Sequence, residues 1–233
     1  MENKHKELLE KWNKTRPEYN QENGFTSDGP SNWHEWTEQK PRILFLLKEA
    51  LDTFTPSNPT QHQIGAKSFG LNIARWKYAI KKLYENPHET LSFPSKEFIK
   101  EWSNNTNADI AIVEVKKFDE NNGVSNPKKI SSYAMRDKEF LKEQIRLINP
   151  QIILCCKTGD DYANYLYIED YDIKEPLISD SNCNCYKDVN RLIIDFYHPS
   201  TRNEARAKEL FEILCKMIKE GNIFKKFDWG NIK

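Results

Sequence analysis

Four short apolar runs constrain the fold of this 233-residue chain more than any other feature. They are Ile43–Leu47, Ile110–Val115, Ile152–Cys156 and Leu192–Tyr197. Each run is too short for a helix, and each is followed by polar loop residues. Because the runs lack clean alternation of apolar and polar residues, they predict strands that are buried on both faces. Such strands are typical of a parallel sheet covered by helices.

Amphipathic segments lie between these runs and predict helices. The expected helices are Phe69–Tyr84, Pro94–Trp102, Arg136–Ile148, Thr158–Leu166 and Glu204–Ile218. An N-terminal helix over residues 4–13 and a polar loop over residues 20–31 precede the first strand as an elaboration. The alternation of strands and helices predicts one α/β domain over residues 1–233. Its architecture is three-layer α/β/α, with a central four-stranded, mostly parallel sheet.

The composition excludes several classes of protein. The 6 Trp, 10 Tyr and 12 Phe supply enough apolar surface to exclude a wholly disordered chain. With 35 basic and 35 acidic residues the net charge is zero, so the field of a strong non-specific DNA binder is absent. Any contact with DNA or with a nucleotide-like ligand is therefore expected to be local.

The cysteines and the longest apolar run suggest the cellular location. Cys155, Cys156 and Cys215 fall in apolar patterns and are expected as buried thiols in a reducing cytoplasm. Cys183 and Cys185 have the wrong spacing for half of a zinc site, so we expect neither a metal nor a cofactor. No run approaches the roughly 20 apolar residues that a membrane span needs, and no signal peptide is visible, so no membrane association is expected.

Charged residues stand where the four predicted strands end. Lys48, Lys116 and Lys157 each open the loop after a strand, and His198 opens the loop after the last strand. In a parallel α/β sheet the ligand site lies beyond the carboxyl ends of the strands. These four loops are therefore the predicted site.

The segment around His198-Pro199-Ser200 has the most specific pattern. It follows a buried strand and leads through Arg202 into a long helix, and an earlier helix ends at Asn149-Pro150 before another apolar strand. Together these features resemble the uracil-DNA glycosylase superfamily, from about Arg42 to Cys215. The resemblance implies a hydrolase of base-excision DNA repair, which cleaves the N-glycosidic bond of a base extruded from DNA.

The resemblance also implies roles for individual residues. His198 matches the histidine that donates a hydrogen bond to the leaving base. Ser200 matches a residue whose hydroxyl contacts a phosphate, and Arg202 adds charge beside it. The aromatic residue that stacks on the base is expected from Phe54, Phe69 or Phe118, with Phe69 ranked first.

Two strand ends depart from the family pattern. The glycine and proline that normally follow the first strand are missing, and Glu49 becomes the candidate for orienting the attacking water, with Asp52 in reserve. At the second strand Glu114 falls where the family has an asparagine that reads the uracil edge. An ionised glutamate offers acceptors only. Either the bound base presents two donors, or Glu114 is protonated, or the activity is not uracil excision.

Structural interpretations of the same residues stay open at this point. Glu49 can be a solvated carboxylate paired with Lys48, and Glu114 can form a salt bridge with Lys48, Lys116 or Lys157. The three aromatic candidates can simply belong to the core. Two other functions also fit: a binding module that has lost its chemistry, and a hydrolase of free nucleosides. The glycosylase interpretation requires Glu49, Glu114 and His198 to face one shared hollow.

Overall fold

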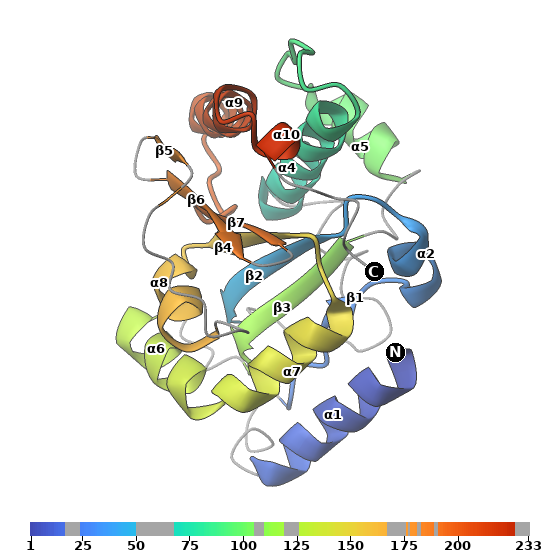
Figure 1. Ribbon diagram of the computed structural model, residues 1–233, viewed down its shortest axis with the longest axis vertical. Helices are drawn as coiled ribbons and strands as arrows, with labels where there is room; N and C mark the ends of the chain where they lie inside the picture. The colour runs from blue at the N-terminus through green and yellow to red at the C-terminus, as the bar shows by residue number, and fades with distance from the viewer. Residues whose placement is uncertain are drawn as a thin grey trace.

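The computed structural model describes residues 1–16, 24–49, 68–104, 110–118, 126–166, 176, 178–180, 183–188 and 191–226. Strands and helical segments alternate along the chain up to the fourth strand, and the last three strands follow one another (Figure 1). The strands are β1 (Gly29–Pro30), β2 (Ile43–Glu49), β3 (Ile110–Lys116), β4 (Ile152–Cys156), β5 (Ile178–Asp180), β6 (Cys183–Asp188) and β7 (Arg191–Phe196). The helices are α1 (Glu2–Thr15), α2 (Trp33–Glu38), α4 (Ser68–Glu85), α5 (Lys96–Asn104), α6 (Pro127–Arg136), α7 (Lys138–Ile148), α8 (Gly159–Asp161), the π-helix η3 (Tyr162–Leu166), α9 (Glu204–Glu220) and α10 (Ile223–Lys226).

The strands form one mixed sheet in the order β1-β3-β2-β4-β7-β6-β5. The four predicted strands are its centre, and β3, β2, β4 and β7 run parallel to one another. The α/β class is therefore confirmed, but the expected four-stranded sheet is too small. Three further strands, β1, β5 and β6, join it in antiparallel pairing. They escaped the search for apolar runs because β1 has two residues and β6 places the polar Asn184 between its two cysteines.

Helices cover both faces of the sheet (Figure 1). Helices α4, α5 and α9 cover what we term the α4/α9 face, where Ile112, Trp76 and Phe211 are fully buried or nearly so. Helices α1, α6 and α7 cover the opposite α1/α7 face, whose core includes Trp12 and Ile145. Side chains of one strand alternate between these two cores, as a sheet buried on both sides requires.

Most of the predicted helices are confirmed to within a few residues. The exceptions have physical reasons. The Arg136–Ile148 helix begins at Lys138, because a separate helix, α6, ends at Arg136 after starting with Asn126 as its cap and Pro127 as its first residue. The Thr158–Leu166 segment is a three-residue helix that continues as a π-helix. In the described part of the chain no helix is both long and apolar enough to cross a membrane.

A buried polar network joins α1 to the α1/α7 face. The Lys117 ammonium donates to both Asp28 carboxylate oxygens at 2.7 Å and to Gln144 Oε1 at 2.9 Å. The Gln144 amide in turn lies 3.2 Å from Nε2 of His5 on α1. Burial is the main reason that the pKa of His5 falls to about 4, so this imidazole is neutral. The N-terminal helix is thus fixed by hydrogen bonds as well as by apolar packing.

Candidate functional site

The sheet has a topological switch point between β2 and β4. From β2 the chain passes to β3 on one side and later to β4 on the other, so the connections leave in opposite directions. In open α/β sheets a ligand binds beyond the carboxyl ends of the strands at such a point. We call this side of the sheet the carboxyl edge. Lys48 and Glu49 end β2 there, and Lys157 follows β4.

His198 lies half-buried at this edge, two residues after the end of β7. The backbone N–H of Ser200 donates to His198 Nδ1 at 3.3 Å, so the ring proton of the neutral imidazole is carried by Nε2. Burial, with a smaller contribution from the positive charge of Lys48, lowers the pKa of His198 to about 4. His198 is consequently a neutral hydrogen-bond donor at neutral pH and not a cation.

Of the three aromatic candidates, Phe69 lies beside His198. It stands in the first turn of α4, and its ring centroid is 5.8 Å from that of the histidine. Phe118 packs elsewhere, on the α1/α7 side, at 5.4 Å from the ring of Tyr133. Phe54 lies outside the described residues, as does Asp52. Among the described candidates, the structure therefore brings only Phe69 to the histidine.

The turn that carries His198 is attached to α4 through Asn72. The Asn72 amide donates to the carbonyl of Pro199 at 2.8 Å and to that of Thr201 at 3.1 Å. One turn further along α4, the buried guanidinium of Arg75 pairs with Glu204 at 2.5 Å and so holds the start of α9. Our sequence analysis missed both residues. The sequence feature that could have identified them is a pair of polar side chains, an amide and a guanidinium, within the apolar stripe of an amphipathic helix.

Ser200 and Arg202 are exposed next to His198, where phosphate contacts were expected. The N–H of Ser200 is already used by the histidine, whereas its hydroxyl lies on an exposed residue. At the start of α9, Asn203 Oδ1 accepts from the N–H of Arg206 at 3.1 Å, so one of the free N–H groups of this helix end is capped. This turn can therefore bind a phosphate through positive charge rather than through an uncapped helix end.

Two further cations lie against Tyr197 at the same edge. The Lys157 ammonium is 4.6 Å from the centroid of the tyrosine ring, and the Arg206 guanidinium carbon is 4.9 Å from it. Lys157 adopts a left-handed conformation with φ of 61°, and its N–H donates to the carbonyls of Cys155 and Phe196. This conformation turns the chain at the end of β4.

Asp195 on β7 is a perturbed carboxyl near this edge. Its pKa rises to about 6, mainly through burial, although Lys157 and a hydrogen bond from the Gly159 N–H oppose the rise. A Cβ atom on Gly159 would lie only 2.3 Å from the Asp195 carboxyl carbon. The approach of carboxyl and backbone therefore requires glycine at the start of α8.

Glu49 forms an ion pair, and its partner is Lys116 on the neighbouring strand rather than Lys48. The Lys116 ammonium lies 2.5 Å from Glu49 Oε2, and the side chains are 1% and 7% exposed. The ammonium also lies 4.4 Å from the centroid of the Phe118 ring. The Glu49 carboxylate is therefore not solvated, because the buried Lys116 ammonium binds one of its oxygens.

Glu114 is buried within β3 and has no ionic partner among the described residues. It is 2% exposed, and its Oε2 atom lacks a hydrogen-bond partner there. The lysines that follow it in sequence are engaged elsewhere, Lys116 by Glu49 and Lys117 by Asp28. Burial, reinforced by the negative charges of Asp28 and Glu49, raises the pKa of Glu114 well above its ordinary value, and Lys117 opposes this only in part. This environment therefore favours the protonated form of the Glu114 carboxyl.

The candidate residues form two groups along the carboxyl edge. Glu49 ends β2 and Glu114 lies two residues before the end of β3, whereas His198 with Phe69 lies beyond the end of β7. Glu114 stands level with Leu47, and Cys156 with Phe196, so three inter-strand steps of roughly 4.8 Å separate Glu114 from β7. None of these three ionisable groups lines the pocket that is described below, so the shared hollow stays a prediction.

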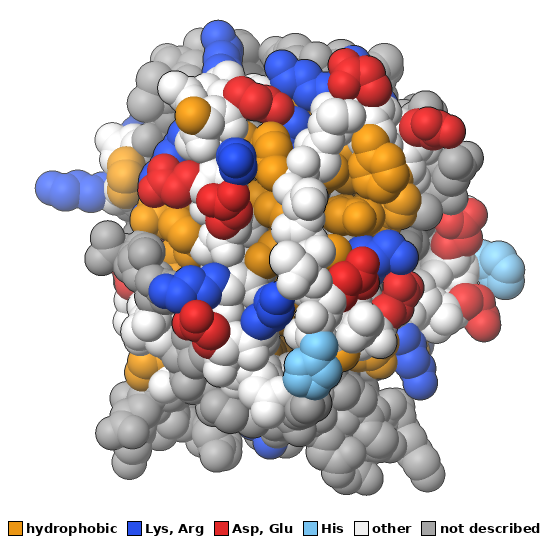
Figure 2. Space-filling model, turned by 90° about the horizontal axis from the view of Figure 1, so that it is seen from above, with side chains coloured by type: hydrophobic (Ala, Val, Ile, Leu, Met, Phe, Trp, Pro, Cys, Tyr) orange, Lys and Arg blue, Asp and Glu red, His pale blue; other side chains and the backbone are white. Residues whose placement is uncertain are grey.

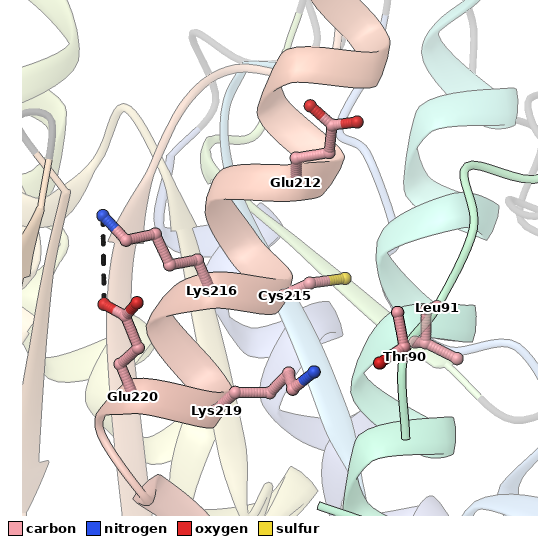
Figure 3. A pocket seen from close by; sticks show the side chains of 7 residues that line it. All are labelled: Thr90, Leu91, Glu212, Cys215, Lys216, Lys219 and Glu220. Atoms are coloured by element: carbon pink, nitrogen blue, oxygen red, sulfur yellow. Dashed lines mark ion pairs between the residues drawn. The ribbon is translucent and has the colours of Figure 1, made fainter. Parts of the chain in front are cut away.

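A shallow pocket of about 290 Å³ is found at a different place (Figure 3). It is lined by Thr90 and Leu91 together with residues of the last turns of α9, including Cys215. Cys215 is eleven residues beyond the first residue of α9, about 16 Å along the helix axis. Because α9 begins at the carboxyl edge, this pocket is remote from His198. Burial raises the pKa of the Cys215 thiol to about 12, so the thiol is unreactive at neutral pH.

The described residues contain no cluster of three or more side chains suited to hold a metal ion. The surface over α4 and α9 carries positive and negative side chains interspersed among apolar ones (Figure 2). This distribution agrees with the net charge of zero. Positive charge at the carboxyl edge is therefore local.

No protein-family model matches this chain, and the comparison with curated proteins gave no match.

Proposed function

We propose that this protein removes a base from DNA by hydrolysing its N-glycosidic bond. The observation that carries the proposal is the state of His198: a neutral imidazole whose Nδ1 accepts from the Ser200 N–H and whose Nε2–H is left as a donor beside an aromatic ring. Its position near the switch point of the sheet and the resemblance to the uracil-DNA glycosylase superfamily support the same conclusion.

In this mechanism His198 stabilises the departing base. Cleavage of the N-glycosidic bond places negative charge on the base, and a preorganised donor favours that charge more in the transition state than in the ground state. The Nε2–H of His198 supplies such a donor without transferring its proton. One donor of this kind accounts for a rate factor of roughly 10²–10³. Phe69 supplies a ring face on which the extruded base stacks.

Glu49 positions the attacking water. Its ion pair with Lys116 fixes the carboxylate and occupies one of its oxygens. An ionised carboxylate has about four acceptor positions, so acceptor capacity remains for a water molecule. Ser200 and Arg202 hold the flanking phosphate through the hydroxyl and the positive charge.

A binding module that has lost catalysis is the second candidate, and the Glu49–Lys116 pair is the observation that favours it. A carboxylate neutralised by a buried ammonium is a weaker acceptor than a free one. In that case the same edge holds a nucleotide or an end of a nucleic acid, while no bond is cleaved.

The test is single-turnover incubation of the chain with oligonucleotides that carry different altered bases. We expect strand scission after alkali treatment for at least one base, and a rate for His198→Ala that is at least 10²-fold lower. The matched control is His34→Ala, because His34 is an exposed histidine on α2. Binding of the same oligonucleotides without base release by the wild type supports the binding module instead.

Salt dependence separates phosphate contacts from other modes of binding. Each phosphate that the protein neutralises on duplex DNA contributes about 0.9 to the slope of log K against log salt. We expect a slope that corresponds to one or two neutralised phosphates. In Arg202→Ala the slope should correspond to about one phosphate fewer. A slope of zero argues for a free nucleoside as the ligand.

A further inference from the structure

His5 is a buried titratable group on the face by which α1 packs against the rest of the protein. The buried residues of this helix are His5, Leu9 and Trp12, which recur at helical spacing. The histidine ring lies so close to β1 that a Cβ atom on Gly29 would be 2.7 Å from its Cε1 atom. Gly29 also has φ of 138°, a conformation that favours glycine. The ring therefore fits closely against the backbone of another segment.

The hydrogen bonds of Gln144 show which nitrogen of His5 carries the proton. An ammonium only donates, so it is the Gln144 oxygen that faces Lys117 Nζ, at 2.9 Å. The amide nitrogen of Gln144 then donates to Asp28 Oδ1 at 2.7 Å and lies 3.2 Å from His5 Nε2. Since an amide nitrogen only donates, Nε2 of His5 is the acceptor and the ring proton is on Nδ1. This contact requires a neutral imidazole.

Protonation of His5 would reverse this contact. The Nε2–H of an imidazolium would point at the N–H groups of Gln144, so that two donors would face each other. The new positive charge would also lie near the Lys117 ammonium. That ammonium already neutralises Asp28, with hydrogen bonds of 2.7 Å to both carboxylate oxygens. The buried network has therefore no place for a second cation.

The charges around His5 do not compensate for its burial. Asp28 and Glu2 favour the cation, whereas Lys117 opposes it. From α2 the ring is faced by the uncharged Trp33, with 5.2 Å between the ring centroids. Burial is the largest effect and lowers the pKa of His5 from its ordinary value of 6.5 to about 4. A histidine that leaves this site regains its ordinary pKa, so the attachment of α1 weakens as the pH falls through 6.5 towards 4.

The centre of the sheet does not depend on α1 for its hydrogen bonds, because β3, β2, β4 and β7 pair with one another. At the other end of the helix, Arg16 donates to the buried Asp137 carboxylate at 2.7 Å and provides a hinge. We propose that His5 is a pH-sensitive latch, whose protonation in mild acid releases α1 from the α1/α7 face while the sheet stays folded. The released helix uncovers the ring of Phe140, on which Trp12 stacks.

The experiment is hydrogen exchange of the whole chain by mass spectrometry at pH 7 and pH 5, corrected for the intrinsic exchange rates. Protection of the α1 amides should fall about twentyfold, the factor that follows from a pKa of 6.5 in the released helix and about 4 in the attached one. Protection of α9 should not fall with it. His5→Gln keeps an acceptor for Gln144 but cannot gain a proton, so its α1 protection should not vary with pH. His34→Gln, at an exposed histidine of α2, is the matched control and should respond as the wild type does.

The tautomer of His5 is an independent readout, which decides the question even where His5→Gln fails to hold α1 at pH 7. In nitrogen NMR spectra of the wild type at pH 7, the imidazole should be neutral with its proton on Nδ1. The proposal is overturned if His5 is cationic or carries its proton on Nε2 at pH 7, or if α1 is equally protected at both pH values. It is also overturned if His5→Gln shows the wild-type pH response, or if α9 loses protection together with α1.

Discussion

Replacing Glu114 by glutamine should make the protein more stable, by an amount that grows with pH. In the folded protein the pKa of this carboxyl lies well above its ordinary value of 4.5, so the folded state keeps a proton that the unfolded chain releases. The folded state then binds more protons than the unfolded state, and the free energy of unfolding falls as the pH rises from 4.5 towards the folded pKa. Glutamine carries no such proton and removes this loss.

The magnitude follows from linkage. One pH unit within this window corresponds to about 1.4 kcal/mol for a single group. The stability difference between Glu114→Gln and the wild type should therefore widen with each pH unit above about 4.5, until the folded carboxyl itself ionises. Other titrating groups, such as His5 and Asp195, contribute equally to both proteins and cancel in the difference.

Urea unfolding at several pH values measures this difference. Glu101→Gln is the control, because it makes the same substitution at a glutamate that is exposed on α5. A stability difference for Glu114→Gln that stays constant between pH 5 and pH 7 would show that the carboxyl ionises normally, and it would refute the reasoning.

Three further predictions concern the carboxyl edge. Lys116→Met should destabilise the fold by about 3–5 kcal/mol because it leaves the buried Glu49 carboxylate unpaired, and adding Glu49→Gln should restore much of the loss in chemical denaturation. His198 should show no titration between pH 5.5 and 8 in NMR spectra of the imidazole, and Lys48→Met should raise its pKa without restoring 6.5, because burial is the larger cause; a midpoint near 6.5 in the wild type contradicts this. Asn72→Ala should lower the unfolding free energy by about 1–3 kcal/mol, since one buried and one partly buried loop carbonyl lose their donor, and an unchanged midpoint in urea contradicts it.

The centre of the fold could be predicted from the sequence because burial on both faces leaves a pattern that local composition records. The runs at Ile43–Leu47 and Ile152–Cys156 are strands for that reason. The added strands could not be found in this way. Strand β1 is defined by its pairing with β3 rather than by its own two residues. The sequence of β6 resembles that of a polar segment with two cysteines.

The candidate site was only partly predictable from sequence. Loop position placed His198 at the carboxyl edge, and the resemblance ranked Phe69 first among three aromatic candidates, which the structure brings beside the histidine. The pairing of Glu49 with Lys116 depends on the register between β2 and β3, which no local pattern contains. The isolation of Glu114 likewise depends on which carboxylates hold its neighbouring lysines. Long-range pairing therefore decided the chemistry of both glutamates.

The polar contacts between α1 and the body of the protein have a consequence for any shortened version of the chain. His5 and Trp12 are buried against Gln144 and Lys117. The first helix therefore covers the ion pair between Lys117 and Asp28, two residues that lie in other segments of the chain. A chain that starts after Thr15 would expose the Lys117–Asp28 pair to water together with the ring of Phe140, on which Trp12 stacks. Trimming the N-terminus would thus hydrate the interior of the molecule at a point more than a hundred residues away in sequence.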